Sequence, residues 1–319
     1  MLNELATLRS SLVGHNVGIA DVHPWVKRKG RTLTLVAGLD ARGMVQTVEF
    51  LTPDESATLS NIQPDNHHSF PGFNIDPPVW EIDTGSRTVL ENIPASDVRG
   101  RVAALRAACE TARLTGKAAK AIRGIRSYAG ELRPRFRAPE PMFAAFDAVL
   151  DRSARLGESA DAWFRSLTEA ALGAAEDGGE KTAEHIAALL VGKGEAKGRK
   201  FAVIVDAADY AGFPCRVADQ RMGGYFSRQL LATEDEGGER GVCSLTGAQL
   251  AIQTEPFPRP NLPVLGQTSL MSMNPDTPCQ TRYGRIGTEV FRTGKATLKD
   301  LNASLVGITA AGQEYKTWQ

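Results

Sequence analysis

A run of one-signed charge in the middle of the chain is the strongest chemical feature of this sequence. Between Arg101 and Arg137 the chain has ten basic residues, and only Glu110 and Glu131 oppose them. The basic residues are Arg101, Arg106, Arg113, Lys117, Lys120, Arg123, Arg126, Arg133, Arg135 and Arg137. Like charges at this density repel one another unless an anion lies against them. Phosphate is the obvious anion, because each neutralised phosphate releases a counterion.

The spacing of these charges fits a helix. Arg113, Lys117, Lys120 and Arg126 can line one helical face through steps of three and four residues. A hydrated, charged helix surface without a ligand is the alternative. We predict Lys117, Lys120 and Arg123 as nucleic-acid contacts.

A second basic tract lies near the start of the chain. Lys27, Arg28, Lys29 and Arg31 place four positive charges within five residues. In one interpretation the tract binds a phosphate backbone. In the other it has no ligand, and its charges only keep an exposed sheet edge soluble. We predict these four side chains as phosphate contacts.

A polar segment in the last quarter of the chain has the side chains that read bases. Gln267, Thr268, Ser269 and Asn274 offer donors and acceptors to base edges and to the sugar-phosphate backbone. A little further on, Arg282 and Tyr283 form a pair suited to stacking. A polar loop without a ligand is the alternative.

A metal site is the main alternative to a purely binding protein. Asp65, His67 and His68 gather two imidazoles and a carboxylate. Neighbouring side chains point apart, and a hydrolytic metal site needs at least three ligands and an open position. A metal-dependent nuclease centred on these three residues therefore stays open as the alternative function.

Other catalytic patterns are missing from the sequence. It contains no GxSxG nucleophile, no phosphate-binding P-loop and no GxGxxG before a helix. Its cysteines, Cys109, Cys215, Cys243 and Cys279, are widely spaced without a CxxC pair, which is typical of free thiols. We expect no enzyme activity, no cofactor and no metal.

These residues need elements that position them. Residues 32–37 and 44–50 alternate on either side of a turn and predict a β-hairpin. Residues 61–78 read as irregular, residues 79–82 as a strand, and residues 84–87 as a break. Leu2 to Leu12 has the spacing of a short helix.

The rest of the chain is helical and then mixed. We expect three to five helices from about Ser96 to Leu190, with breaks near Gly116, 133–134 and 178–179, and with their aromatic residues in the core. We further expect strands at 201–205 and 269–273, and helices at 221–231 and 297–308, the latter capped by Thr297. The prediction is an α+β fold with a β-rich region at 1–95, a helical region at 96–195 and a mixed region at 196–319.

Composition narrows the class of protein. The chain has 319 residues, with 37 basic and 37 acidic ones, so its net charge is zero. This balance argues against a protein that coats nucleic acid over its whole surface, but it leaves room for local basic surfaces. No apolar run approaches the ~18 residues of a spanning helix, and no signal peptide is read at the start. We expect a cytoplasmic protein.

Several short motifs together resemble the large subunit of the type I-C CRISPR surveillance complex. They are an early leucine-containing helix and hairpin, Cys243-Ser244-Leu245-Thr246-Gly247, the segment from Gly266 to Asn274, and Tyr283-Gly284. Their order and approximate spacing match that family. This chain differs in having Arg282 where the family has serine before Tyr-Gly. It also stops at Gln319, whereas members of the family continue into a helical bundle.

The resemblance implies a role in DNA surveillance. It implies a subunit that recognises the short motif flanking the target, helps to open the duplex, and binds crRNA and target DNA beside the other subunits of the complex. A separate, recruited helicase-nuclease would cut the DNA. A structural assembly subunit, whose basic stretch meets an acidic protein and not nucleic acid, is a further alternative.

Overall fold

The computed structural model describes most of the chain, in several stretches. These are Glu4, Thr7, Leu8, His23 and residues 25–65, 68–136, 143–156, 159–192, 200–209, 216–234, 239–254, 256–262, 265–271, 284–285 and 287–309. They form two compact units. Unit 1 comprises Met1–Lys27, Ile62–Asp65 and Gly223–Gln319, and unit 2 comprises Arg28–Asn61 and Asn66–Met222. Each unit is therefore assembled from segments that are distant in sequence.

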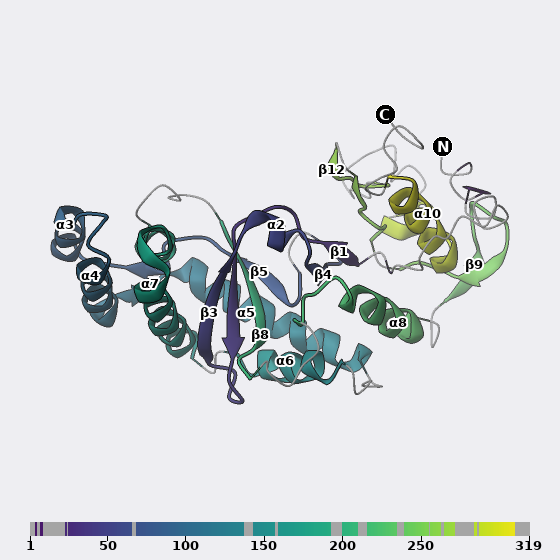
Figure 1. Ribbon diagram of the computed structural model, residues 1–319. Coiled ribbons are helices and arrows are strands. Elements are labelled where there is room, and N and C mark those ends of the chain that lie inside the picture. Colours follow the sequence, from purple (N-terminus) through teal and green to yellow (C-terminus); the bar gives the residue numbers. More distant parts are fainter. Residues whose placement is uncertain are drawn as a thin grey trace. The chain divides into compact units, whose positions relative to one another are not determined.

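Unit 2 is built on a four-stranded sheet with the strand order β3-β2-β8-β5 (Figure 1). Strand β2 (Thr34–Leu39) pairs antiparallel with β3 (Val45–Leu51) and parallel with β8 (Phe201–Ala207), and β5 (Gly72–Ile75) completes the sheet antiparallel to β8. Every residue of β2 and β8 is buried, as expected for central strands. The predicted hairpin and the strand predicted at 201–205 are confirmed.

The hairpin turn explains why the chain reverses where it does. The Asp40 carboxylate accepts the backbone N–H groups of Arg42 and Met44, at 2.8 and 2.9 Å. Gly43 has a positive φ of 82°, a conformation that costs glycine little. Aspartate and glycine thus supply the two features that a tight turn requires.

Helices surround this sheet. They are α3 (Thr84–Asn92), α4 (Val98–Thr111), α5 (Gly116–Leu132), α6 (Ala144–Ala154) and α7 (Ala160–Val191), with the short helices α2 (Pro53–Ser56) and η1 (Arg133–Arg135). Helix α7 packs against β3 and α4, while α5 packs against β5 and α6, and α6 also meets β8. The predicted aromatic core is confirmed, since Phe146, Trp163 and Phe164 are fully buried.

Two helix details test the sequence interpretation. The break predicted at residues 178–179 is confirmed by Gly179, which has a φ of 75° inside α7. The break predicted at 84–87 is wrong, because α3 begins there. Asp83 caps α3 by accepting the N–H of Ser86, so the polar residues that suggest a loop are in fact a helix start.

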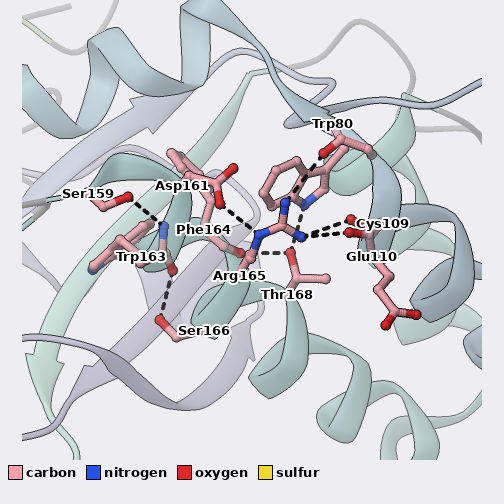
Figure 2. Close-up of polar contacts among 12 residues, drawn as sticks. Trp80, Cys109, Glu110, Ser159, Asp161, Trp163, Phe164, Arg165, Ser166 and Thr168 are labelled. Atoms are coloured by element: carbon pink, nitrogen blue, oxygen red, sulfur yellow. Dashed lines mark hydrogen bonds and ion pairs between the residues drawn. The ribbon is translucent and has the colours of Figure 1, made fainter.

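A single arginine ties three elements of unit 2 together (Figure 2). Arg165 on α7 donates to the carbonyl oxygens of Cys109 and Glu110 near the end of α4, at 3.2 and 3.1 Å. Its guanidinium carbon lies 4.9 Å from the ring centroid of Trp80 in β6 (Trp80–Glu81). The Trp80 indole N–H in turn donates to the Thr168 hydroxyl at 2.8 Å. Arg165 therefore donates to the Glu110 carbonyl at the helix end and is a second donor to the Cys109 carbonyl, which also accepts the Ala112 N–H.

The remaining strands are short. Strand β6 pairs with β7 (Arg113–Leu114), and β1 (Val26–Arg28) pairs with β4 (Ser60–Ile62). In the last part of the chain, β9 (Arg240–Val242) pairs with β10 (Gln249–Ala251), and β11 (Asn261–Leu262) pairs with β12 (Gly266–Gln267).

Helices of this last part are α8 (Met222–Glu234), η4 (Gly287–Glu289) and α10 (Lys295–Ile308). A small core of Phe257, Leu298 and Leu301 anchors α10. The helices predicted at 221–231 and 297–308 are confirmed. The N-cap predicted for α10 is wrong, because Gly294 and not Thr297 occupies it. With helices and mixed sheets throughout, the predicted α+β class is confirmed.

Candidate nucleic-acid interface

Helix α5 turns a basic face toward solvent. Thr115 caps its start by accepting the N–H of Ala118. The buried side is apolar and consists of Ala118, Ile122, Ile125, Tyr128, Ala129 and Leu132. Lys117, Lys120 and Arg123 lie on the other side, and all three are exposed. None of the three makes an ion pair with any residue in the described part of the chain. We call these three residues the α5 face.

Small residues surround the α5 face. A Cβ atom built at Gly116, Gly124 or Gly130 would meet nothing within 4 Å. Gly124 follows Lys120 by four residues and therefore lies one turn along the same side of the helix. A surface without side chains beside the cations allows a phosphate backbone to approach the helix closely.

Three other basic residues of the central stretch are neutralised by ion pairs. Arg106 is 3.2 Å from Glu169 and 3.4 Å from Glu176, both on α7. Arg101 meets Glu184 of the same helix, and Arg133 meets Asp147 and Asp151 on α6. The one-signed charge seen in the sequence is therefore reduced, in the fold, to a smaller cationic surface centred on α5.

Two further members of the stretch do not fit the predicted helical face. Arg113 lies in β7 and not on a helix, so its predicted place beside Lys117 and Lys120 is wrong. Arg126 is exposed on α5, but it is nine residues beyond Lys117 and therefore lies about half a revolution around the helix from that residue. Arg137 lies outside the described residues.

The tract from Lys27 to Arg31 divides into different environments. Arg28 and Arg31 are exposed, and Arg31 is 3.4 Å from Asp54 in an ion pair that is open to solvent. Lys29 is half-buried, and its burial lowers the pKa of its amine to about 8. Burial, together with repulsion from Arg259, lowers the pKa of Lys27 to about 8 against the opposing effect of Asp65. The tract is therefore not a uniform, fully charged edge.

Part of the predicted base-reading segment lies at a hairpin. Gln267 ends β12, and Gln267 and Ser269 are exposed while Thr268 is half-buried. Residues 269–271, the described part of the strand predicted at 269–273, are not in a strand, and that prediction is wrong for them. Asn274, Arg282 and Tyr283 lie outside the described residues. The structure thus brings together Gln267, Thr268 and Ser269 from that set.

The Cys243-Ser244-Leu245-Thr246-Gly247 motif forms a tight turn. Gly247, with a φ of 71°, donates its N–H to the Cys243 carbonyl at 2.8 Å. The Cys243 sulfur lies 3.6 Å from the Thr297 hydroxyl oxygen. Burial acts to raise the pKa of the Cys243 thiol, but hydrogen bonds to the sulfur, from Gly294 and Thr246 among others, outweigh it and lower the pKa to about 7. The motif therefore fixes the start of α10.

A second group of cations, missed by the sequence analysis, lies in unit 1. Arg259, Lys295 and Lys299 line one pocket together with Trp25 and Gln253. The three basic residues are half-buried, and none of them makes an ion pair within the described part of the chain. The run Pro256-Phe257-Pro258-Arg259-Pro260, with one charge among prolines, is the signal in the sequence that could have indicated this site.

The predicted alternative metal site is only partly described. The ring of His68 packs against Tyr128 on α5, with ring centroids 5.4 Å apart. His67 lies outside the described residues. Among the residues described, no three His, Cys, Asp or Glu side chains are placed to hold a metal ion.

Comparisons with known proteins add no identification. No model of a known protein family matches this chain, and no curated protein matches it either. Within the part of the chain that the structure describes, no helix combines the length and apolar character needed to cross a membrane.

Proposed function

We propose that this protein binds nucleic acid without cutting it, as a subunit of a CRISPR surveillance complex in the cytoplasm. The observation that carries the proposal is the α5 face, where Lys117, Lys120 and Arg123 stay exposed and unpaired among the described residues. In a chain of zero net charge, the three cations of the α5 face keep their charge while Arg101, Arg106 and Arg133 form ion pairs, and this concentrates positive potential on α5.

The proposed partners follow from the motifs that resemble the type I-C large subunit. They are crRNA and target DNA, the other subunits of the complex, and a recruited helicase-nuclease that does the cutting. In this role Gln267, Thr268, Ser269 and Asn274 contact the flanking motif of the target, with Arg282 and Tyr283 beside them. Lys27, Arg28, Lys29 and Arg31 contribute phosphate contacts, of which the exposed Arg28 is the best placed.

Salt dependence of DNA binding tests the α5 face. Each lysine or arginine that neutralises a phosphate of duplex DNA contributes about 0.9 to the slope of log affinity against log salt. The triple variant Lys117→Ala, Lys120→Ala, Arg123→Ala is therefore expected to flatten that slope by about 2 to 3 and to weaken duplex binding at low salt. Fluorescence anisotropy with a labelled duplex over a salt series measures both quantities.

A charge-matched variant supplies the control. Arg42, Arg87 and Arg99 are exposed, lie elsewhere in unit 2 and make no ion pair within the described residues. Replacing these three by alanine removes the same charge from scattered positions. Equal slopes for the two triple variants would contradict a specific α5 interface and leave only a general charge effect.

Recognition of the flanking motif needs a different readout. In the assembled complex, Gln267→Ala is expected to reduce the preference for duplexes with the correct flanking motif, while binding to other duplexes changes little. Loss of a good base contact costs about 1 to 3 kcal/mol of discrimination. Unchanged discrimination would remove Gln267 from the proposal.

The two alternatives make opposite predictions in the same assays. A metal-dependent nuclease centred on Asp65, His67 and His68 predicts cleavage of DNA or RNA by the purified chain when divalent metal is added, and loss of cleavage in His68→Ala. A structural assembly subunit predicts no affinity for nucleic acid at any salt concentration. Either result would overturn the proposal.

A further inference from the structure

The pocket in unit 1 combines positive charge with an aromatic surface. His23, Trp25, Gln253, Arg259, Lys295 and Lys299 line it, with prolines and Leu298 forming the rest of its wall. Among the described lining residues, all the charged side chains are basic and none is a carboxylate. The pocket is therefore suited to an anion, and its composition differs from that of an apolar ligand site.

The fold holds the cations of this pocket in place. Arg259 lies between Pro258 and Pro260, whose rings restrict the backbone and lower the entropy cost of fixing the arginine. Next to it, Phe257 is buried against Leu298 of α10. This packing joins the proline-rich segment to the helix that carries Lys295 and Lys299, so the three charges gather before any ligand arrives.

A fourth cation strengthens the positive potential. The Lys27 ammonium is shut off from solvent and has no hydrogen-bond partner among the described residues. It interacts repulsively with Arg259, and among the described residues Asp65 acts on it in the opposite sense. Half-buried like charges repel strongly, because the protein interior screens them less than water does. An anion bound beside Arg259 would relieve this repulsion.

The aromatic side of the pocket is equally well fixed. The Trp25 backbone N–H donates to Nδ1 of His23 at 3.1 Å, and the two rings meet edge to face with centroids 5.2 Å apart. His23 is fully buried, while Trp25 is only half-buried. An indole whose position is fixed by His23, and which is partly exposed to solvent, is a suitable surface for stacking a flat ring.

The enclosed space of this pocket is about 20 Å³, so a ligand lies across its mouth and not inside it. We propose that one nucleotide binds there, with its phosphate against Arg259, Lys295 and Lys299 and its base against Trp25. Gln253 lines the same pocket, and its backbone N–H donates to the Thr293 carbonyl at 2.9 Å. In this proposal its side-chain amide hydrogen-bonds the base edge. This inference rests on the proposed function and deepens it. A nucleotide in a single strand and a free nucleotide carry the same chemical groups, and the test separates the two sources.

Two probes and three sets of variants of the full chain test the pocket. The probes are uridine monophosphate, followed by calorimetry, and a labelled single strand of about eight nucleotides, followed by anisotropy. Arg259→Gln with Lys299→Gln removes two phosphate contacts, and Arg240→Gln with Arg285→Gln removes equal charge from exposed positions of unit 1 outside the pocket. Trp25→Leu removes stacking, whereas Trp25→Phe keeps an aromatic ring.

The expected results are specific to the pocket. The Arg259 and Lys299 double variant and Trp25→Leu each weaken binding by about tenfold, while Trp25→Phe and the charge control stay within about twofold of the wild type. Loss confined to the strand identifies a nucleotide of a strand as the ligand, and loss for both probes identifies a site that also takes free nucleotides. If Trp25→Leu fails to fold, competition by inorganic phosphate against uridine monophosphate tests the contribution of the base.

Other outcomes overturn the inference. If the pocket variants bind both probes as the wild type does, the pocket takes no nucleotide. If inorganic phosphate competes as well as uridine monophosphate, Trp25 plays no part and the base-binding half is wrong. Strand binding that depends on the α5 face but not on the pocket would refute the pocket and leave the proposed function standing. Binding of uridine monophosphate without any strand binding would refute the proposed function and keep the pocket.

Discussion

Asp206 is a carboxyl group that the fold buries near the end of its central strand. Only 3% of the residue is exposed. Burial raises the pKa of this carboxyl to about 6, although the N–H groups of Ala207 and Val217 donate to it and act in the opposite direction. The native state therefore keeps a proton on Asp206 up to about pH 6, whereas the unfolded chain releases it near the usual value of 3.8.

This difference makes stability depend on pH in a predictable direction. Between pH 4 and pH 6 the folded state binds more protons than the unfolded state does, so the free energy of unfolding falls as the pH rises through this window. The full effect of Asp206 is about 3 kcal/mol, at 1.36 kcal/mol for each unit of pKa. The replacement Asp206→Asn, which keeps the acceptor oxygen and removes the ionisation, is expected to stabilise the protein at pH 7.5 by up to that amount.

Urea unfolding at pH 4 and at pH 7.5 measures the prediction. The gain from Asp206→Asn should be small at the lower pH and large at the higher one. Because all other carboxyl groups are shared by wild type and variant, the difference between the two proteins isolates this position. A gain that does not change with pH would mean that Asp206 titrates normally in the folded protein.

At the scale of elements, helix α5 contains an exposed glycine, Gly124, which lowers the stability of the helix. Gly124 is exposed, has no positive φ, and leaves open space where a Cβ would lie. Alanine at such a position stabilises a helix by about 0.5 to 1 kcal/mol. The glycine is consistent with a face that a phosphate backbone approaches closely, since a side chain there would stand between Lys120 and its ligand.

Gly124→Ala and Gly124→Leu separate stability from binding. Both are expected to raise the free energy of unfolding of unit 2, by about 0.5 to 1 kcal/mol for alanine. Duplex affinity at low salt should fall in Gly124→Leu, because its larger side chain covers the α5 face. Gly173→Leu is the matched control, because Gly173 is exposed on α7 and a Cβ there would also meet nothing within 4 Å. Unchanged affinity in Gly124→Leu would show that no ligand lies close to this part of α5.

The same elements show how far sequence reasoning reaches. The hairpin of β2 and β3, the strand β8 and the helix α10 were predictable, because alternation, apolar runs and helical spacing are local patterns. Helix α3 was not, since Gly85 and Ser86 look like loop residues and only the geometry of Asp83 makes them a helix start. Local signals of this kind point to two structures at once, and packing against α4 selects between them.

Contacts between residues distant in sequence explain why the sequence did not predict which basic residues form the candidate interface. Arg106 meets acids 63 and 70 residues further along the chain, so the sequence cannot indicate that its charge is neutralised. Arg259 and Lys295 gather because Phe257 packs on Leu298 in the folded unit. The charge of a segment is a property of the sequence, whereas the charge of a surface is decided by long-range contacts.

At the scale of the whole molecule, the division into two compact units has a thermodynamic consequence. Each unit has its own core, Phe257, Leu298 and Leu301 in unit 1 and the sheet with its helices in unit 2. Units with separate cores unfold in separate transitions unless their interface couples them. A change confined to one core is therefore expected to move one transition and leave the other in place.

Arg165→Met is the change best suited to test this. It keeps an apolar stem but removes the Arg165 donor from the Glu110 carbonyl, and from the Cys109 carbonyl that the Ala112 N–H still contacts, which costs about 1 to 3 kcal/mol. In a unit of this size such a loss lowers the transition temperature by roughly 2 to 12 °C.

Calorimetry should show one transition shifted by that amount, and tryptophan fluorescence shows which unit this transition belongs to. In a background of Trp25→Phe and Trp318→Phe, Trp80 and Trp163 of unit 2 supply the whole signal. If both transitions move together, or if only one exists, the two units fold as a single cooperative body and the charge clusters on them cannot be treated as independent.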